Sequence, residues 1–333
     1  MDPRILDRLR CPVCGEPLAE TTAGTARALR CPRRHSFDIA RQGYVNLLAG
    51  RAPHAGDSAE MVAARADFLA AGHYDLVADA LAAAAIEAAA RFRATTSAPA
   101  TTPLCSASTE ATEAGPECRA EVSRAKDPEE GVPARPAAAG FGAYPLVVDA
   151  GAGTGRYIGA VLAALPDAVG LSLDVSKPAL RRAARAHPRA AAALADTWQR
   201  LPLADASTAV LLNVFAPRNG AEFHRVLDPA GTLLVVTPAA EHLAELVDAL
   251  DLLRVDPDKA DRVTGSLGGH FTPDTSTVHR AELTLTRPEV ATLVGMGPSA
   301  WHTDPAALAA RLAALPEPVR VTVAVRLDVY RPR

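Results

Sequence analysis

Four residues whose side chains bind transition metals lie close together near the start of the chain: Cys11, Cys14, Cys31 and His35. The first pair has the spacing C-x2-C, the second has C-x3-H, and sixteen residues separate the two pairs. Three thiolates and one imidazole suit tetrahedral Zn²⁺. Because the protein would fill every coordination position, we expect a structural zinc site and not a catalytic one.

A glycine-rich turn forms a second group of residues with chemical potential. In the segment VVDAGAGTGRY, Asp149 ends a predicted strand and is followed by Gly151, Gly153 and Gly155. Glycines at such a turn let the backbone pass close to a ligand, towards which the N–H groups of the next helix point. The next predicted strand ends at Asp174, where an acid can accept hydrogen bonds from two ribose hydroxyls. The two features together predict a site for a nucleoside-containing cofactor.

The sequence pattern of the turn, G-x-G-x-G after an acid that ends a strand, resembles that of the class I S-adenosylmethionine-dependent methyltransferases. Nicotinamide-binding enzymes, the alternative, carry G-x-G-x-x-G. The resemblance continues in LADTWQRLPLAD, where Asp196 would lie at the adenine edge of the cofactor. It continues also in LDPAGTLLVVTP, which is similar to the hxPGGxLhhh segment of these enzymes with Ala230 in place of one glycine. The resemblance implies S-adenosyl-L-methionine as cofactor.

These residues need a scaffold, and the sequence after residue 140 alternates between strand-like and helix-like segments. This alternation predicts an α/β fold with a mostly parallel sheet covered by helices, and two final strands that form an antiparallel edge. We expect the Rossmann-like class I fold with a seven-stranded sheet, preceded by a small zinc-binding β domain. Residues 57–93 are predicted to form two helices divided at Gly72, with Asp57 or Ser58 as N-cap.

The charge of the chain is unevenly distributed. Residues 1–51 contain nine arginines and five acids and therefore carry a charge of +4. Because the net charge of the chain is −3, the remaining residues carry −7. Arg30, Arg33 and Arg34 surround the second ligand pair, where zinc would hold them rigidly, and guanidinium groups suit phosphates and base edges. A single-stranded or hairpin RNA is the expected target because its bases can be turned towards a methyl donor.

The predicted organisation has four parts. Residues 1–50 form a zinc-binding RNA-recognition domain, 51–93 a helical connector, and 141–333 the methyltransferase domain. Between them, residues 94–140 are rich in Ala, Thr, Pro and Glu, contain Cys105 and Cys118, and are predicted to be a disordered linker or insertion. No apolar stretch reaches the ~18 residues of a membrane span, and the N-terminus lacks the features of a signal peptide, so the expected location is the cytoplasm.

Taken together, the segments resemble the bacterial 23S rRNA (guanine-N1)-methyltransferases of the RlmA type. They are CPVC, CPRRHSFDIARQGYVNLL, GDSAEMVAARADFLAAGHYDLVADAL, DAGAGTGRY, LSLDVSK, VFAP, TPAAEHLAEL and MGPSAW. The resemblance implies methylation of guanine N1 in a 23S rRNA hairpin near the macrolide site of the exit tunnel, with one branch contributing to tylosin-type resistance. It also implies a homodimer. The family has only a short link where this chain carries residues 94–140.

The resemblance also implies roles for individual residues. Thr154, Gly155 and Arg156 would hold the methionine end of the cofactor, and Asp174 its ribose. Tyr74 and His242 would approach the cofactor, although Tyr74 could instead be a packing aromatic and His242 a residue without ligand contact. Asn213 and the carbonyl of Ala216, in the segment NVFAP, are possible contacts to the target base.

Some functional alternatives remain open. A small-molecule methyltransferase acting on a quinone or antibiotic precursor would explain the glycine turn but leave the zinc-binding segment without a purpose. The intact Asp149, glycines and Asp174 argue against an RNA-binding protein with an inactive methyltransferase domain, which failure to bind S-adenosylmethionine would support. A redox sensor is disfavoured because thiolates held by zinc are inert. Trp301 is expected in the core in preference to a base-stacking role, and no residue is identified as a general base.

Overall fold

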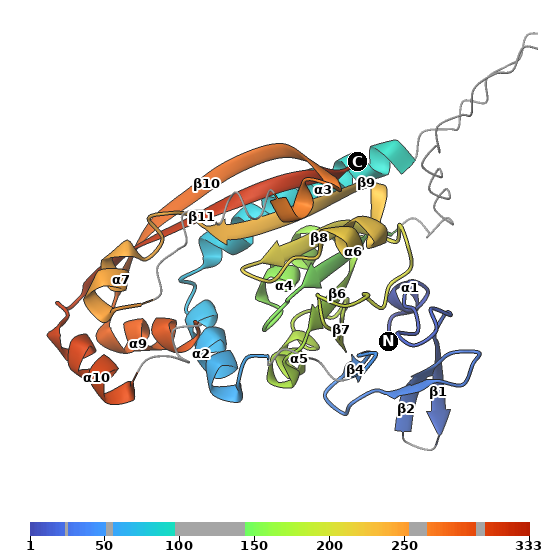
Figure 1. Ribbon diagram of the computed structural model, residues 1–333, viewed down its shortest axis with the longest axis horizontal. Coiled ribbons are helices and arrows are strands. Elements are labelled where there is room, and N and C mark those ends of the chain that lie inside the picture. Colours follow the sequence, from blue (N-terminus) through green and yellow to red (C-terminus); the bar gives the residue numbers. More distant parts are fainter. Residues whose placement is uncertain (24–25, 51–55, 97–143, 253–264, 298–303) are drawn as a thin grey trace, which may run out of the picture.

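The structure is a computed structural model that describes residues 1–23, 26–50, 56–96, 144–252, 265–297 and 304–333 (Figure 1). All but the first three residues of the predicted 94–140 linker lie outside the described residues, as does Trp301.

An eight-stranded sheet forms the centre of the molecule, in the order β10-β11-β9-β8-β5-β6-β7-β4. Neighbouring strands are parallel from β9 through to β4, and β11 and β10 add an antiparallel edge. The mostly parallel sheet and its antiparallel edge confirm the prediction, and the sheet has one strand more than expected. The strands are β4 (Tyr44–Asn46), β5 (Leu146–Ala150), β6 (Val169–Asp174), β7 (Ala190–Leu194), β8 (Thr208–Val214), β9 (Leu227–Pro238), β10 (Phe271–Leu285) and β11 (Val319–Pro332).

Both faces of the sheet are apolar over its central strands because successive strand residues alternate between two cores. Val147, Leu212 and Leu234 belong to one cluster, whereas their neighbours Val148 and Leu211 belong to another on the opposite face. On the first face lie α3 (Asp75–Thr96), α4 (Arg156–Ala164), α7 (Ala244–Leu250) and α9 (Arg287–Gly295). The remaining helices are α1 (Pro3–Leu6), α2 (Ala59–Ala70), α5 (Lys177–Ala183), α6 (Gly220–Val226) and α10 (Pro305–Ala314).

The N-terminal segment forms a three-stranded antiparallel sheet of β1 (Ala19–Ala23), β2 (Ala26–Arg30) and β3 (Ser36–Asp38). The segment RCPVCGEPL has the sequence pattern of a strand–turn–strand, with Gly15 and Pro17 at the turn, but the structure forms only one bridge there, between Arg10 and Pro17. The segment ALRCPRRHSFDIARQGYVNLL predicts a second short hairpin, which β2 and β3 form; the last strand of the segment, β4, keeps only one bridge to it, between Ile39 and Val45, and pairs in parallel with β7 of the large sheet. Tyr44 and Val45 are buried there, so the apolar core draws this strand away from the small sheet.

The second face of the large sheet is shared with this N-terminal segment. Ile5, Leu9 and Leu29 are fully buried in the same cluster as strand residues Leu146 and Val148. The backbone N–H of Arg10 also donates to the carbonyl of Pro202, at 3.0 Å. The zinc-binding segment is therefore joined to the sheet by a common hydrophobic core.

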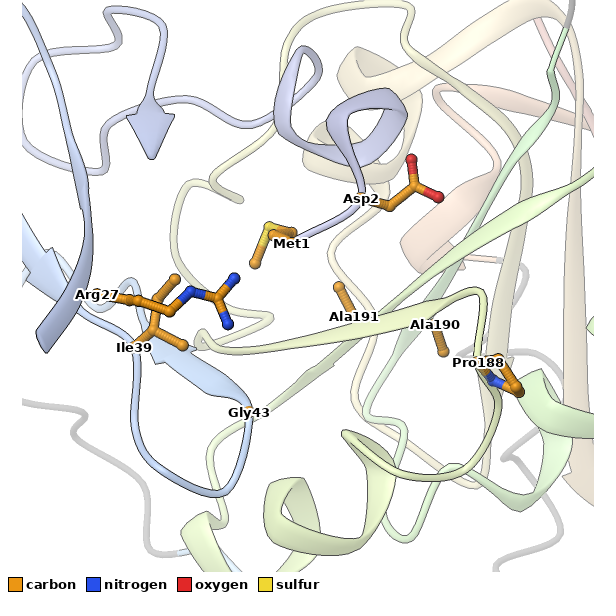
Figure 2. Close-up of a pocket in the computed structure, with 8 residues that line it drawn as sticks. All are labelled: Met1, Asp2, Arg27, Ile39, Gly43, Pro188, Ala190 and Ala191. Atoms are coloured by element: carbon orange, nitrogen blue, oxygen red, sulfur yellow. The ribbon is translucent and has the colours of Figure 1, made fainter. Parts of the chain in front are cut away.

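A pocket of 310 Å³ lies where the N-terminal segment meets the large sheet (Figure 2). Its lining includes Arg27 and Ile39 from the N-terminal segment and Ala190 and Ala191 from the amino end of β7. Cofactors bind at the carboxyl ends of parallel strands, so this pocket lies at the wrong end of β7 for the predicted cofactor site.

Two helices connect the N-terminal segment to the sheet, as predicted. The Ser58 hydroxyl accepts a hydrogen bond from the N–H of Met61 and caps α2. The chain then turns at Gly72, where a φ of +84° favours glycine, before α3 begins. No single helix in the described ranges is long and apolar enough to cross a membrane, and only α2 and α3 taken together, bent by 78°, meet that test by length and composition.

Candidate active site and metal centre

The four predicted metal ligands come together in the N-terminal segment. Their ligand atoms all lie within 4.8 Å of one another. The Sγ atoms of Cys14 and Cys31 are 3.7 Å apart, and Nδ1 of His35 lies 3.5 Å from Sγ of Cys11 and 3.3 Å from Sγ of Cys31. A tetrahedral zinc with bonds of ~2.3 Å to sulfur and ~2.0 Å to nitrogen places neighbouring ligand atoms ~3.5–3.8 Å apart. The donor set therefore fits a zinc ion.

Two tight turns present these ligands in pairs. The N–H of Gly15 donates to the carbonyl of Cys11, and the N–H of Arg34 donates to the carbonyl of Cys31. Gly15 and Arg34 both have positive φ, at +76° and +69°, which closes each turn around its ligands. The side chain of Arg34 and those of Arg30 and Arg33 are exposed, and none forms an ion pair with a described residue. The three guanidinium groups are therefore available to an anionic partner.

The glycine-rich turn follows β5 and adopts backbone conformations that side chains would disturb. Gly151, Gly153 and Gly155 have φ values of +87°, +54° and +79°. A Cβ on Gly151 would lie 2.4 Å from Cβ of Ala216, so this glycine is required by close packing. A Cβ on Gly153 would meet no atom closer than Nη1 of Arg65, at 3.6 Å. Gly153 thus faces the space in which a cofactor could lie.

Helix α4 begins directly after this turn. Gly155 is its N-cap and provides no side-chain hydrogen bond, so the first N–H groups of α4 remain available to a ligand. Thr154 is half-buried beside them. Arg156 is exposed and forms an ion pair with Asp75 at the start of α3. The guanidinium of Arg156 therefore pairs with Asp75, whereas the sequence predicted a contact with the methionine end of the cofactor.

The acids predicted to serve the cofactor lie at the carboxyl ends of three adjacent strands, β5, β6 and β7. Asp174 accepts hydrogen bonds from the N–H groups of Gly153 (2.8 Å) and Ser176 (2.7 Å), which fix its carboxylate against the glycine turn. Asp196 is buried and accepts a hydrogen bond from the N–H of Trp198, at 2.9 Å. These bonds orient both acids before any ligand arrives.

Asp149 has a different environment. It is fully buried, and no group in the described part of the chain makes a hydrogen bond of good geometry to either carboxylate oxygen, although the backbone N–H of Ile158 on α4 lies near enough to favour the ionised form. Burial, and secondarily the charge of Asp174, raises the pKa of Asp149 to about 8. A carboxylate in this position has no cationic partner among the described residues, and the amino and sulfonium groups of S-adenosylmethionine are cations. The buried carboxylate of Asp149 and the uncrowded space beside Cα of Gly153 together fit that cofactor.

Tyr74 and His242 meet in a cluster of rings. The backbone N–H of Ala324 donates to Nδ1 of His242 at 3.2 Å, so this nitrogen carries no proton. The proton must then be on Nε2, which lies 3.2 Å from the Tyr74 hydroxyl and donates to it. Phe215, which follows β8, completes the cluster with ring centroids 6.3 Å from Tyr74 and 6.2 Å from His242. Burial raises the pKa of Tyr74, which therefore stays protonated.

Asn213 lies on β8 and is completely buried. Its side-chain amide donates to the carbonyls of Ala150 (3.1 Å) and Pro217 (2.8 Å). A buried amide committed to two backbone carbonyls holds the loop after β8 and has no exposed surface for a base.

The sequence analysis did not identify Arg65, which belongs to α2. Its guanidinium pairs with Asp57 and donates to the carbonyl of Met296, at 2.7 Å. The Asp57 carbonyl in turn accepts a hydrogen bond from the hydroxyl of Ser176, at 2.8 Å. The positive charge of Arg65 lowers the pKa of Asp174, Tyr74 and Tyr157, against the larger effect of their burial. Arg65 therefore lies within the candidate cofactor site, and no local motif marked it because it precedes the glycine turn by almost ninety residues.

Comparison with known proteins agrees with this geometry. Residues 9–52 match the family described as RlmA, N-terminal, a zinc ribbon. A protein of Micromonospora griseorubida is 62% identical over 333 residues, all of both chains, and its name places it among the 23S rRNA (guanine-N(1)-)-methyltransferases. The 23S rRNA (guanine(748)-N(1))-methyltransferase of Streptomyces fradiae is 43% identical over 332 residues, which cover 100% of this chain and 99% of the relative.

The chain belongs to the RlmA-type 23S rRNA (guanine-N1)-methyltransferase family. A more distant member, YxjB of Bacillus subtilis (strain 168), is 27% identical over 242 residues, 71% of this chain and 66% of the relative. As an RlmA-type enzyme, the protein is an S-adenosylmethionine-dependent methyltransferase with a class I fold and a Cys3His zinc ribbon. When bound, S-adenosylmethionine supplies a methyl group made electrophilic by its sulfonium.

The pKa of Asp149 predicts that cofactor affinity depends on pH. The folded free enzyme holds this proton up to about pH 8, whereas the unfolded chain loses it near the ordinary value of 3.8, so the free enzyme becomes less stable between those values. A cationic ligand favours the ionised carboxylate. We expect the affinity for S-adenosylmethionine to rise roughly eightfold from about pH 6 to about pH 7, below the range in which the α-amino group of the ligand itself loses its proton, and binding should release a proton.

Isothermal titration calorimetry in buffers of different ionisation enthalpy measures both the affinity for S-adenosylmethionine and the number of protons released on binding. The Asp149→Asn variant should bind more weakly and lose this pH dependence. An affinity of the unmodified enzyme that stays constant over this interval would contradict the assignment of Asp149.

Proposed function

We propose that this enzyme transfers a methyl group from S-adenosylmethionine to N1 of a guanine in 23S rRNA. The target is the guanine that corresponds to position 748 in the name of the Streptomyces fradiae relative. This proposal rests on one observation: the zinc ribbon shares one hydrophobic core with the sheet that bears the cofactor turn, and it carries three exposed arginines that form no ion pair with a described residue. That shared core holds an RNA-binding surface in a fixed relation to the site of methyl transfer.

Methyl transfer to a ring nitrogen needs accurate positioning of the acceptor. As the S–CH3 bond breaks and the N1–CH3 bond forms, the N1 proton must leave. Tyr74 and the Nε2–H of His242 are proton donors in the observed arrangement, and Asn213 is a buried amide. These side chains orient groups and do not accept the proton, so we propose release of the N1 proton to solvent.

We propose the following residues as the cofactor site, on the support of their location around the ends of β5, β6 and β7 and, for Tyr74 and His242, of their contact with Phe215 at the end of β8. They are Tyr74, Asp149, Gly151, Gly153, Thr154, Gly155, Arg156, Asp174, Asp196 and His242. To these we add Arg65, whose contacts with the site are described above. Arg156 would act through its N–H at the start of α4, because its side chain pairs with Asp75.

We propose the domain limits 1–50, 51–93, 94–140 and 141–333, with β4 as the strand through which the first part joins the last. We propose further that the enzyme is a cytoplasmic homodimer. The long strand β10 supports dimerisation, because β11 is the only strand of the described sheet that pairs with it and its other edge is open. We propose also a contribution to resistance against tylosin-type macrolides, which the resemblance to the resistance branch of the family supports.

The decisive experiment is methyl transfer from labelled S-adenosylmethionine to 23S rRNA that lacks the modification, followed by primer extension. N1-methylguanine cannot pair, so reverse transcriptase should stop at one guanine in the exit-tunnel hairpins. Absence of label in the RNA, with the cofactor still bound, would indicate a small-molecule acceptor.

The three ribbon arginines should contribute to the salt dependence of RNA binding. Replacing Arg30, Arg33 and Arg34 by alanine removes up to three phosphate contacts, so the slope of log K against log salt should become shallower by about 2. Fluorescence anisotropy with the 23S hairpin measures this slope. Arg27→Ala is the matched control, because Arg27 already pairs with Glu20 at 2.6 Å. Equal slopes for the triple variant and the unmodified enzyme would exclude these arginines from the RNA interface.

A further inference from the structure

We propose that Phe215 is the platform on which the reacting purine stacks after it leaves the RNA helix. This inference rests on the proposed function and adds the binding site of the acceptor base. Methylation at N1 requires access to the pairing edge of guanine, so the base must be unpaired, and unpaired bases are commonly bound by aromatic side chains.

The backbone and exposure of Phe215 are the first evidence. Its side chain is 41% exposed, although it directly follows β8, all seven residues of which are buried. Its φ is +52°, a left-handed conformation that a bulky residue rarely adopts. Conformations of this kind persist where the surrounding structure enforces them and are concentrated at binding sites. The loop therefore holds an aromatic ring at the surface at an energetic cost.

The position of this loop is the second evidence. Ala216 packs so closely on the glycine turn that a Cβ on Gly151 would lie only 2.4 Å from its own Cβ. Phe215 is the neighbour of this contact, at the carboxyl end of the strand next to β5. A base on its ring would thus lie next to the turn that faces the cofactor.

The ring cluster provides the third evidence. His242 lies behind Phe215 with its ring inclined by only 30° and its centroid 6.2 Å away. A base inserted between two rings needs about twice the stacking distance of ~3.4 Å, or ~6.8 Å, so this gap is too narrow. The base must therefore take the exposed side of Phe215, while His242, itself fixed by Tyr74 and the Ala324 N–H, supports the other.

Asn213 acts as a positioning residue for this platform. Its amide donates to the carbonyl of Ala150 at the end of β5 and to the carbonyl of Pro217, two residues beyond Phe215. Loss of these two bonds would release the loop from β5 and allow Phe215 to leave its left-handed conformation. Asn213 would thus act through Phe215, without contact with the RNA.

The test compares Phe215→Ala with Phe215→Trp in steady-state methylation of a 23S rRNA fragment. Loss of one stacked base should lower kcat/KM for RNA about 5- to 150-fold in Phe215→Ala. Phe215→Trp, which keeps an aromatic face, should stay within about threefold of the unmodified enzyme. The Kd of S-adenosylhomocysteine, from calorimetry, should be the same for all three. Ile86→Ala is the matched control, because Ile86 is a similarly exposed (47%) apolar residue on the outer side of α3.

Two further measurements separate stacking from a folding defect. An RNA with 2-aminopurine at the target position should be brighter when bound to Phe215→Ala than to the unmodified enzyme, because stacking quenches this base. The double variant Asn213→Ala/Phe215→Ala should lose no more activity than Phe215→Ala alone.

The outcomes are distinguishable. If the unmodified enzyme methylates guanine N1 and Phe215→Ala retains its kcat/KM, the platform is refuted while the function stands. The same holds if Phe215→Ala changes only the Kd of the cofactor homologue. If the unmodified enzyme does not methylate RNA at all, the proposed function fails and the platform with it.

Discussion

A Cys14→Ser variant should lose methylation of 23S rRNA, by about 100-fold or more, and keep S-adenosylmethionine binding at temperatures where the sheet remains folded. Structural zinc contributes on the order of 10–16 kcal/mol of binding free energy to small domains, and a serine hydroxyl is a poor substitute for a thiolate ligand. The three strands β1, β2 and β3 have little core of their own. Without zinc, the turns that hold the ligands and the arginines should unfold.

The shared core adds a second expected effect. Cys11 and Cys31 are buried, at 2% and 4% exposure, in the cluster that also contains Leu146 and Val148 of β5. Unfolding of the ribbon would expose part of that cluster to water. We therefore expect the variant's Tm to fall by about 5 °C or more, since 1 kcal/mol corresponds to roughly 2–4 °C in a domain of about 150–250 residues, the size range of the methyltransferase domain.

Three measurements on the same preparation test this expectation: zinc content, Tm by differential scanning calorimetry, and the Kd of the cofactor well below the lowered Tm. Cys105→Ser is the matched control, because Cys105 is outside the metal-binding motif. Unaltered RNA methylation by Cys14→Ser would refute the role of the ribbon in substrate recognition.

The zinc ligands and the cofactor turn could be predicted from the sequence because each depends on local backbone geometry. The pairs Cys11/Cys14 and Cys31/His35 are short motifs whose spacing alone suits a metal ion. Likewise, the position of Gly72 between two helical patterns required a turn, and a φ of +84° is found there. Such patterns need no knowledge of which distant segments meet.

The eighth strand and the common core could not be predicted in this way. Strand β4 has only three residues, too few for a periodic pattern, and its pairing with β7 joins positions about 150 residues apart. The same applies to Leu9, whose bridge to Leu203 links the zinc ribbon to the sheet. The ribbon therefore seemed to be a separate module until tertiary contacts showed otherwise.

The directions of individual side chains were the second feature that the sequence could not predict. On β8 all seven residues are buried, so alternation could not show that Asn213 points into the protein while Phe215 points out of it. Arg156 was predicted to serve the cofactor from its place at the start of a helix, but its guanidinium pairs with Asp75 on another helix. Arg65 reaches the site from α2, which carries no recognisable cofactor motif.

Asp174→Ala should weaken S-adenosylmethionine binding about 100-fold or more. A carboxylate that accepts hydrogen bonds from two ribose hydroxyls makes two charge-assisted bonds, each worth about 1.5–3 kcal/mol. The carboxylate is already held by the N–H groups of Gly153 and Ser176 at 2.8 and 2.7 Å, so little ordering remains to be done on binding. Asp167→Ala is the matched control, since Asp167 is an exposed acid just before the other end of the same strand.

The substitution would also loosen the glycine turn, and a modified ligand separates that effect from the loss of ribose contacts. In the unmodified enzyme, an S-adenosylhomocysteine analogue without the 2′ and 3′ hydroxyls should bind about 100-fold more weakly than the parent compound. In Asp174→Ala the two ligands should bind alike, because the partner of the missing hydroxyls is itself missing. If the analogue still binds Asp174→Ala about 100-fold more weakly than S-adenosylhomocysteine does, another residue holds the ribose. The effect of the substitution would then arise from the glycine turn.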